Sequence, residues 1–172
     1  DWIARHAREA ERRGAQSPDG EEAENLREIA RINRRLVTEP PETFREACQW
    51  ILWYQMAARM YDGSGSLGCL DQILRPYYER EAAAGTLTDE EATFHICCYL
   101  VRDTAYIQLG GYDAEGRDTT CRVSYLVLDA LEWLRIPANV GVAVGEGIDP
   151  GLLRRGVEIQ FDHRNGNPKF LG

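Results

Sequence analysis

Residues 106–144 read YIQLGGYDAEGRDTTCRVSYLVLDALEWLRIPANVGVAV, and this stretch decides the fold class. Residues 106–109 and 140–144 are short runs rich in apolar residues, as is typical of strands buried in a parallel or barrel sheet. The apolar segment 123–134 between them predicts a helix, which Pro137 ends. A strand, a helix and a second strand in succession predict an α/β fold.

The same pattern continues on both sides of this stretch. Asp149 and Pro150 predict the start of a last helix that runs to about residue 162. Upstream, Thr43 and Glu46 have the spacing of a capping box, which predicts a helix over residues 44–60. That helix is apolar nearly all round, so we expect it to be fully buried.

Turn and helix signals organise the rest of the chain. Residues 62–68, DGSGSLG, predict a Gly/Ser loop, and a helix is expected from there to about residue 84. A second capping box at Thr88 and Glu91 predicts a helix to about residue 102. Near the start, residues 2–13 and 21–36 both predict helices, separated by the turn signal SPDG at residues 17–20.

Composition excludes several classes of protein. The 172 residues carry a net charge of −8, with 44% hydrophobic and 28% charged residues, which is typical of an ordered globular chain. An acidic balance argues against nucleic-acid binding, and no apolar run is long enough to span a membrane. Five cysteines without a CxxC spacing predict free thiols rather than disulfides or a zinc site. We therefore expect a cytoplasmic protein.

Three features suggest chemistry, and each has a plainer interpretation. The Gly/Ser loop resembles a phosphate loop but lacks the following Lys and the GxGxxG spacing. Cys97 and Cys98 are adjacent thiols, but neighbouring helical residues point about 100° apart, so they are interpreted as structural. His95 lacks an identifiable partner for general-base work and is interpreted as a surface or half-buried side chain. No grouping has metal-ligand spacing.

Several short stretches, taken in order, resemble the pyruvate formate-lyase domain of glycyl radical enzymes. These stretches are PETFREA (41–47), SLGCLDQ (66–72), RPYYERE (75–81), GTLT (85–88) with EEA (90–92), LGGYD (109–113) with Gly116 and Asp118, SYL (124–126) with LDA (128–130), and Gly166, Pro168 and Phe170 near the end. The sequence departs from the family pattern at Cys69, Cys121 and Arg122, where the family usually has Arg, Asn and Glu.

The resemblance implies a fold and a division of the chain. The family fold is a ten-stranded α/β barrel built from two half-barrels, and this chain would supply part of the first half-barrel with its surrounding helices. Residues 1–172 would form a partial pyruvate formate-lyase-type domain. Within it, residues 1–40 would be peripheral helices and residues 41–172 the half-barrel segment.

The resemblance also implies which residues bind substrate. In this family the segment before the GRxDQ pattern lines the active site, which assigns substrate contacts to Ser64 and Ser66. The strand before the glycine pair faces the barrel interior, which adds Gln108. None of the five cysteines matches the thiyl position, and the radical glycine also lies further along the family's chain. No catalytic residue is therefore expected in this segment.

The implied parent protein is a radical lyase or dehydratase, or a formate-lyase-like acyltransferase, that acts on a small polar metabolite by hydrogen abstraction. Its glycyl radical would be installed by an activating enzyme that uses S-adenosylmethionine and an iron–sulfur cluster, with no cofactor bound directly by this segment. Expected partners are the substrate, that activating enzyme and further copies of the same chain. The alternatives are a non-catalytic scaffold or oligomerisation module of the same ancestry, and an unrelated α/β small-molecule-binding domain.

Overall fold

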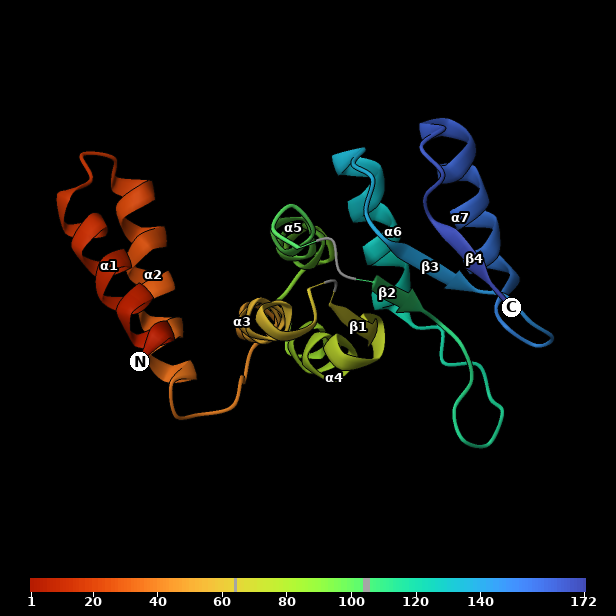
Figure 1. Cartoon of the computed structure of the whole chain (residues 1–172), viewed down its shortest axis with the longest axis horizontal. Coiled ribbons are helices and arrows are strands. Elements are labelled where there is room, and N and C mark those ends of the chain that lie inside the picture. Colours follow the sequence, from red (N-terminus) through yellow and green to blue (C-terminus); the bar gives the residue numbers. More distant parts are fainter. Residues whose placement is uncertain (64, 104–105) are drawn as a thin grey trace. The chain divides into compact units, whose positions relative to one another are not determined.

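A computed structural model describes the chain apart from Ser64, Thr104 and Ala105, and apart from the side chain of Asp62. The chain divides into two compact units, residues 1–42 and residues 43–172 (Figure 1). Each unit forms its own internal contacts.

The first unit is a pair of helices, α1 (Trp2–Gln16) and α2 (Gly20–Leu36), which pack against each other. Asp19 begins α2 by accepting hydrogen bonds from the backbone N–H groups of Glu21 and Glu22. Small buried residues let the two helices approach closely: they are Ala7, Ala10, Gly14, Ala23 and Ala30. Both predicted helices are therefore present, and α1 extends three residues beyond its expected end.

The second unit combines a four-stranded sheet with five helices among the described residues (Figure 1). The strands are β1 (Ser66–Cys69), β2 (Tyr106–Leu109), β3 (Val140–Ala143) and β4 (Lys169–Leu171). The helices are α3 (Phe44–Asp62), α4 (Leu70–Ala83), α5 (Asp89–Leu100), α6 (Arg122–Leu134) and α7 (Pro150–His163). The predicted α/β class is confirmed.

All neighbouring strands pair in parallel, in the order β1-β2-β3-β4. Each strand therefore joins the sheet beside its predecessor, with no reversal of direction. Because parallel crossovers are right-handed, crossovers that all advance in one direction place their helices on the same face of the sheet. A doubly wound sheet, in contrast, reverses its winding and carries helices on both faces.

Local signals begin the helices where the sequence predicts them. Thr43 with Glu46 and Thr88 with Glu91 both form complete capping boxes at the first residues of α3 and α5. The strands at residues 106–109 and 140–143 also lie where the apolar runs predict them. These elements depend on contacts within a few residues, which is why sequence patterns find them.

Part of the Gly/Ser loop prediction is wrong, because Ser66–Cys69 forms strand β1. Its residues have little intrinsic preference for a strand, and glycine is depleted in strands. Backbone pairing with β2 holds it instead, with Ser66 opposite Tyr106 and Cys69 opposite Gln108. The register shifts between Ser66 and Gly68, a bulge that the positive φ of +73° at Gly68 accompanies.

The prediction that the Trp-rich helix is fully buried is wrong within the described chain. Helix α3 packs on α4 and α5, but Trp50 is 42% exposed, Tyr54 57% and Tyr61 91%. One side of α3 thus joins the core through Phe44, Ala47 and Ile51, and the other side has no cover among the described residues. A helix that is apolar all round needs protein on every side, and this chain supplies only part of it.

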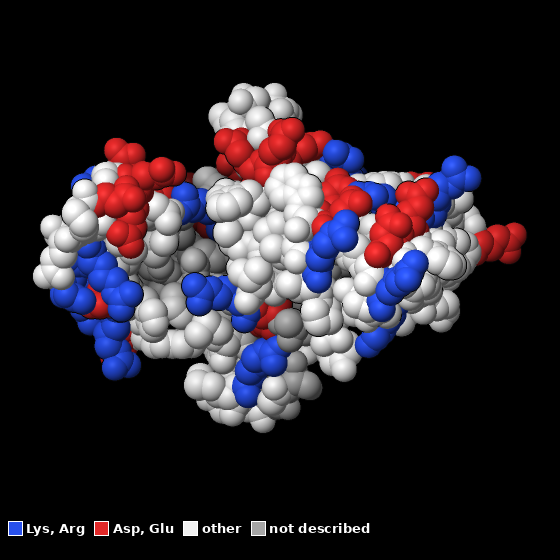
Figure 2. All heavy atoms as spheres, turned by 90° about the horizontal axis from the view of Figure 1, so that it is seen from above, with Lys and Arg blue, Asp and Glu red and all other residues white. Residues whose placement is uncertain are grey.

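Charged side chains of both signs are interspersed on the surface that Figure 2 presents. Among the described residues, several charged side chains form ion pairs along one helix, such as Arg75 with Glu79 at 2.6 Å. Exposed pairs of this kind contribute little to stability, about 0.2–1 kcal/mol each.

Candidate functional site

The two faces of the sheet differ in their surroundings. Ile107 and Leu109 of β2 and Val140 and Val142 of β3 are buried and belong to the core formed with the helices. Ile107 pairs with Val140 and Leu109 with Val142, so the four side chains share one face. Because successive strand residues point to opposite faces, the residues between them face away from the helices.

The opposite face, here called the open face, has no helix layer among the described residues. In the register it consists of Ser66, Cys69, Tyr106, Gln108, Gly141, Ala143, Lys169 and Leu171. Tyr106 is 54% exposed and Leu171 45%, although parallel sheets are normally covered on both faces. The open face is therefore a surface that needs cover from outside the described residues.

Small residues shape the centre of the open face. Gly141 of β3 lies between Gln108 of β2 and Lys169 of β4 in the register. A Cβ built on Gly141 would lie 2.5 Å from Leu171 Cδ1, so the leucine occupies the space that a side chain would take. The Lys169 ammonium lies 5.7 Å from the centre of the Tyr106 ring, a cation–π contact across the sheet.

Two of the three predicted substrate-binding residues lie on the open face. Ser66 is exposed at the start of β1, and Gln108 is half-buried in β2. Gln108 approaches the backbone closely, since a Cβ built on Gly111 would lie 3.4 Å from its Nε2. The third, Ser64, lies outside the described residues. Ser66 and Gln108 thus belong to adjacent strands and share one face.

A buried carboxylate fixes the loops at the carboxyl ends of β1 and β2. Asp71, in the first turn of α4, is completely buried. Its Oδ2 accepts hydrogen bonds from Gly110 N at 2.8 Å and Ser124 Oγ at 2.6 Å, and its Oδ1 accepts from Gln72 N at 2.8 Å. Burial raises the pKa of the Asp71 carboxyl, while these three donors act in the opposite direction. Asp71 therefore ties β1, β2 and α6 together.

Further side chains of the motifs also bind backbone. Gln72 Nε2 donates to Thr119 O at 2.7 Å, and Asp118 Oδ2 accepts from Asp149 N at 3.0 Å. The Tyr125 hydroxyl donates to Asp149 Oδ2 at 2.5 Å. The segment after β2 is thus fastened to α4 and to the start of α7.

The motifs of the family resemblance include Asp71, Gln72 and Asp118, but the resemblance implies no role for them. The donors that compensate the buried Asp71 carboxylate lie far along the chain, so no local pattern in the sequence reveals this anchoring role. Two of the divergent positions form contacts of another kind. Arg122 pairs with Asp89 at 2.6 Å, and Cys121 N donates to Ser124 Oγ at 3.1 Å.

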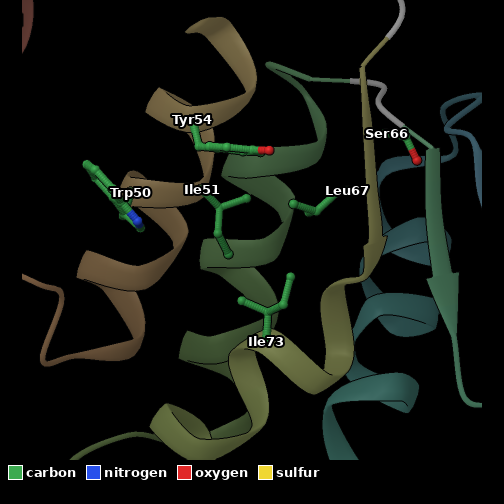
Figure 3. Close-up of a pocket in the computed structure, with 6 residues that line it drawn as sticks. All are labelled: Trp50, Ile51, Tyr54, Ser66, Leu67 and Ile73. Carbon is green, nitrogen blue, oxygen red and sulfur yellow. The ribbon is translucent and has the colours of Figure 1, made fainter. Parts of the chain in front are cut away.

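A shallow apolar pocket lies on the helix side of β1, with a volume of 320 Å³ (Figure 3). It is lined by Trp50, Ile51, Tyr54, Ser66, Leu67 and Ile73. Figure 3 shows Leu67 pointing toward the helices, while the Ser66 hydroxyl lies on the β2 side, away from the five apolar side chains. The pocket therefore offers apolar surface, and the polar groups belong to the open face.

The adjacent cysteines do not form a redox pair. Cys97 is buried and Cys98 is exposed on α5. Burial raises the pKa of the Cys97 thiol to about 11, so it stays protonated at neutral pH. Cys69, opposite Gln108 in the register, is half-buried, and burial followed by the Asp71 charge raises the pKa of its thiol. The structural interpretation of Cys97 and Cys98 agrees with their opposite exposure.

His95 lies on α5 within the helix layer, and its protonation makes the stability of the fold depend on pH. Burial, followed by the charge of Arg45, lowers the pKa of its imidazole to about 4, while Glu91 acts in the opposite direction. The unfolded chain binds this proton more readily, so the stability contributed by neutral His95 is present above pH 6.5 and is lost as the pH falls toward 4.

We therefore expect the free energies of unfolding of the wild type and of His95→Gln to diverge with pH. From pH 7.5 to pH 4.5, the wild type should lose about 1–2 kcal/mol more than the variant. Urea titrations at both pH values measure this difference. Equal losses in the two proteins would show that folding does not lower the pKa of His95.

Within the described ranges, no cluster of three or more His, Cys, Asp or Glu side chains is arranged to hold a metal ion. Among the described helices, none is both long enough and apolar enough to cross a membrane.

Fold and site together define a segment of a singly wound α/β sheet, with helices on one face and a polar, uncovered surface on the other. The pyruvate formate lyase-like family model matches residues 1–171. The chain belongs to this family, whose members similar to it are glycyl radical enzymes. Family membership excludes the alternative of an unrelated α/β binding domain.

Relatives of known activity include lyases and dehydratases. The chain is 28% identical over 151 residues to isethionate sulfite-lyase of Nitratidesulfovibrio vulgaris, covering 74% of this chain and 18% of the relative. It is 25% identical over 181 residues to trans-4-hydroxy-L-proline dehydratase of Clostridioides difficile, covering 90% of this chain and 23% of the relative. The chain thus spans about a fifth of the length of these relatives.

Solved structures share the fold. The B12-independent glycerol dehydratase of Clostridium butyricum, solved with glycerol bound, matches with a TM-score of 0.86 and 25% identity. A structure from Roseburia inulinivorans concerned with 1,2-propanediol dehydration also matches with a TM-score of 0.86, at 28% identity. Each match covers more than 90% of this chain and 23% of the other.

Proposed function

We propose that this chain is the substrate-lining segment of a glycyl radical dehydratase or lyase that acts on a small polar metabolite. The observation that carries the proposal is the open face, where Ser66 and Gln108 present a hydroxyl and an amide on adjacent strands. Both groups donate and accept hydrogen bonds, as recognition of a polar substrate requires. Family membership supports the reaction class.

In this proposal the residues of the segment line the substrate site and do not themselves react. The winding in one direction and the bare outer side of α3 support closure of the sheet into a barrel by further strands and helices of a longer polypeptide. Residues 1–40 would be peripheral helices and residues 41–172 part of the first half-barrel. Closure would exclude water from the open face, which strengthens each polar contact there.

The radical chemistry would come from elsewhere in that polypeptide. A glycyl radical, installed by an S-adenosylmethionine- and iron–sulfur-dependent activating enzyme, supplies hydrogen abstraction in such enzymes. The residues of this chain would bind and orient the substrate. We further propose that the parent protein is a homo-oligomer that works in the reducing cytoplasm, where the five free thiols of the described chain are stable.

An activation experiment tests the proposal. The full-length polypeptide that carries this segment, treated anaerobically with its activating enzyme, should give a glycyl radical doublet in electron paramagnetic resonance. It should then turn over at least one of isethionate, trans-4-hydroxy-L-proline, glycerol and 1,2-propanediol. Residues 1–172 alone should give no doublet. A doublet from this segment alone would contradict the proposal, and a full-length polypeptide without a radical would favour the non-catalytic scaffold.

A further inference from the structure

A buried polar side chain lies directly beneath the turn that leads into β1. Gln55 of α3 is completely buried, and a Cβ built on Gly65 would lie 2.8 Å from its Oε1. The backbone at Gly65 has a φ of +65°, a conformation that residues other than glycine rarely adopt. Because glycine has no Cβ, the backbone at position 65 can approach the Gln55 amide closely.

The burial of the Gln55 amide lowers the stability of the fold. Neither Oε1 nor Nε2 of its amide has a hydrogen-bond partner among the residues that the structure describes. Leaving a buried polar group unsatisfied costs about 1–3 kcal/mol. An apolar side chain of the same size would fill this space at lower cost, so stability alone does not explain an amide here.

A neighbouring charged residue of α3 also contacts this segment of backbone. Arg59, one helical turn after Gln55, pairs with the buried Asp103 at 2.5 Å, and its Nη1 donates to Gly63 O at 3.4 Å. A Cβ on Gly65 would also lie 3.4 Å from Arg59 Cγ. One face of α3 thus contacts the backbone at Gly63 and at Gly65, and Asp103, in the segment that precedes β2, fixes the arginine.

We propose that Gln55 is a positioning residue that sets the backbone at Gly65 and so orients Ser66 on the open face. The Oε1 end of the Gln55 side chain lies beside Gly65, and this reach, rather than a hydrogen bond, places the backbone there. The inference rests on the proposed function, because Ser66 matters only if it meets substrate. Its test is chosen so that it does not depend on turnover.

The test compares backbone hydrogen exchange at residues 65–69 in the full-length polypeptide. Gln55→Leu removes the amide, and its side chain ends one atom short of the Oε1 that lies beside Gly65. It should raise Tm, because two unpaired polar atoms are lost, yet speed exchange at residues 65–69 at least tenfold. Unchanged exchange, or a lower Tm, would overturn the proposal.

A pair of variants tests the contact itself. Gly65→Ala should speed exchange at residues 65–69 at least tenfold, and adding Gln55→Ala should reverse at least half of that change on a logarithmic scale. Gly63→Ala is the control, because a Cβ there meets nothing within 4 Å, and Gln55→Ala should not reverse its effect. Equal reversal in both backgrounds, or none in either, would contradict the contact.

Measurements of turnover then distinguish a role of Gln55 in positioning Ser66 from a role in stability alone. With whichever substrate of the four-compound panel reacts fastest, Gln55→Leu should lower kcat/KM at least fivefold despite its higher Tm. An unchanged kcat/KM would contradict the positioning role. If no compound of the panel reacts, the proposed function fails, and the exchange measurements still decide the inference about Gln55.

Discussion

Replacing Asp71 by Ala should cost about 3–5 kcal/mol at the junction of β1, β2 and α6. The substitution leaves Gly110 N and Ser124 Oγ without their buried acceptor, and each unsatisfied group costs about 1–3 kcal/mol. Exchange of the Gly110 amide in the full-length polypeptide should become at least 100-fold faster, because each 1.4 kcal/mol corresponds to a factor of ten.

Two variants serve as controls for Asp71→Ala. Asp71→Asn keeps one acceptor oxygen, so its effect should be smaller. Glu79→Ala removes an exposed carboxylate on the same helix, paired with Arg75, and should cost no more than about 0.5 kcal/mol. If Asp71→Ala speeds Gly110 exchange no more than Glu79→Ala does, Asp71 is not the anchor of these loops.

Replacing Gln108 by Ala should lower kcat/KM of the activated full-length enzyme by about 10–100-fold, with Tm almost unchanged. A site built to hydrogen-bond a substrate loses about 1–3 kcal/mol when one polar partner is removed. Gln108 is half-buried on the open face, whereas the core side chains of β2 are Ile107 and Leu109. Loss of the Gln108 side chain should therefore lower kcat/KM more than it lowers the stability of the fold.

Gln160→Ala is the matched control for Gln108. Gln160 is also half-buried, but it lies on α7 and donates to Pro168 O at 3.1 Å. Its removal should affect kcat/KM less than threefold. Steady-state kinetics on the reacting substrate of the panel measures both variants. Equal effects would mean that Gln108 has no particular contact with substrate.

Local chemistry explains which elements the sequence predicted. The capping boxes at Thr43 and Thr88 act within four residues, and the apolar run at residues 140–143 requires burial wherever it lies. Strand β1 was missed because its Ser and Gly residues become a strand only by pairing with β2, about 40 residues further along the chain. Pairing at such a distance leaves no local signal.

The candidate site was predictable only in part, for the same reason. The family resemblance predicted Ser66 and Gln108, and the register places both on one face. The anchoring role of Asp71 depends on groups 39 and 53 residues away, which no local pattern reveals. Gln55 was unremarkable in the sequence, since its burial beneath Gly65 follows only from the packing of α3.

The most direct test of the account is a crystal structure of the full-length polypeptide with its substrate bound. We predict that further strands close the sheet into a barrel, and that the substrate lies inside it within hydrogen-bond distance of Ser66 and Gln108. A layer of helices packed on the open face, or a substrate bound on the α3 side of the sheet, would contradict it.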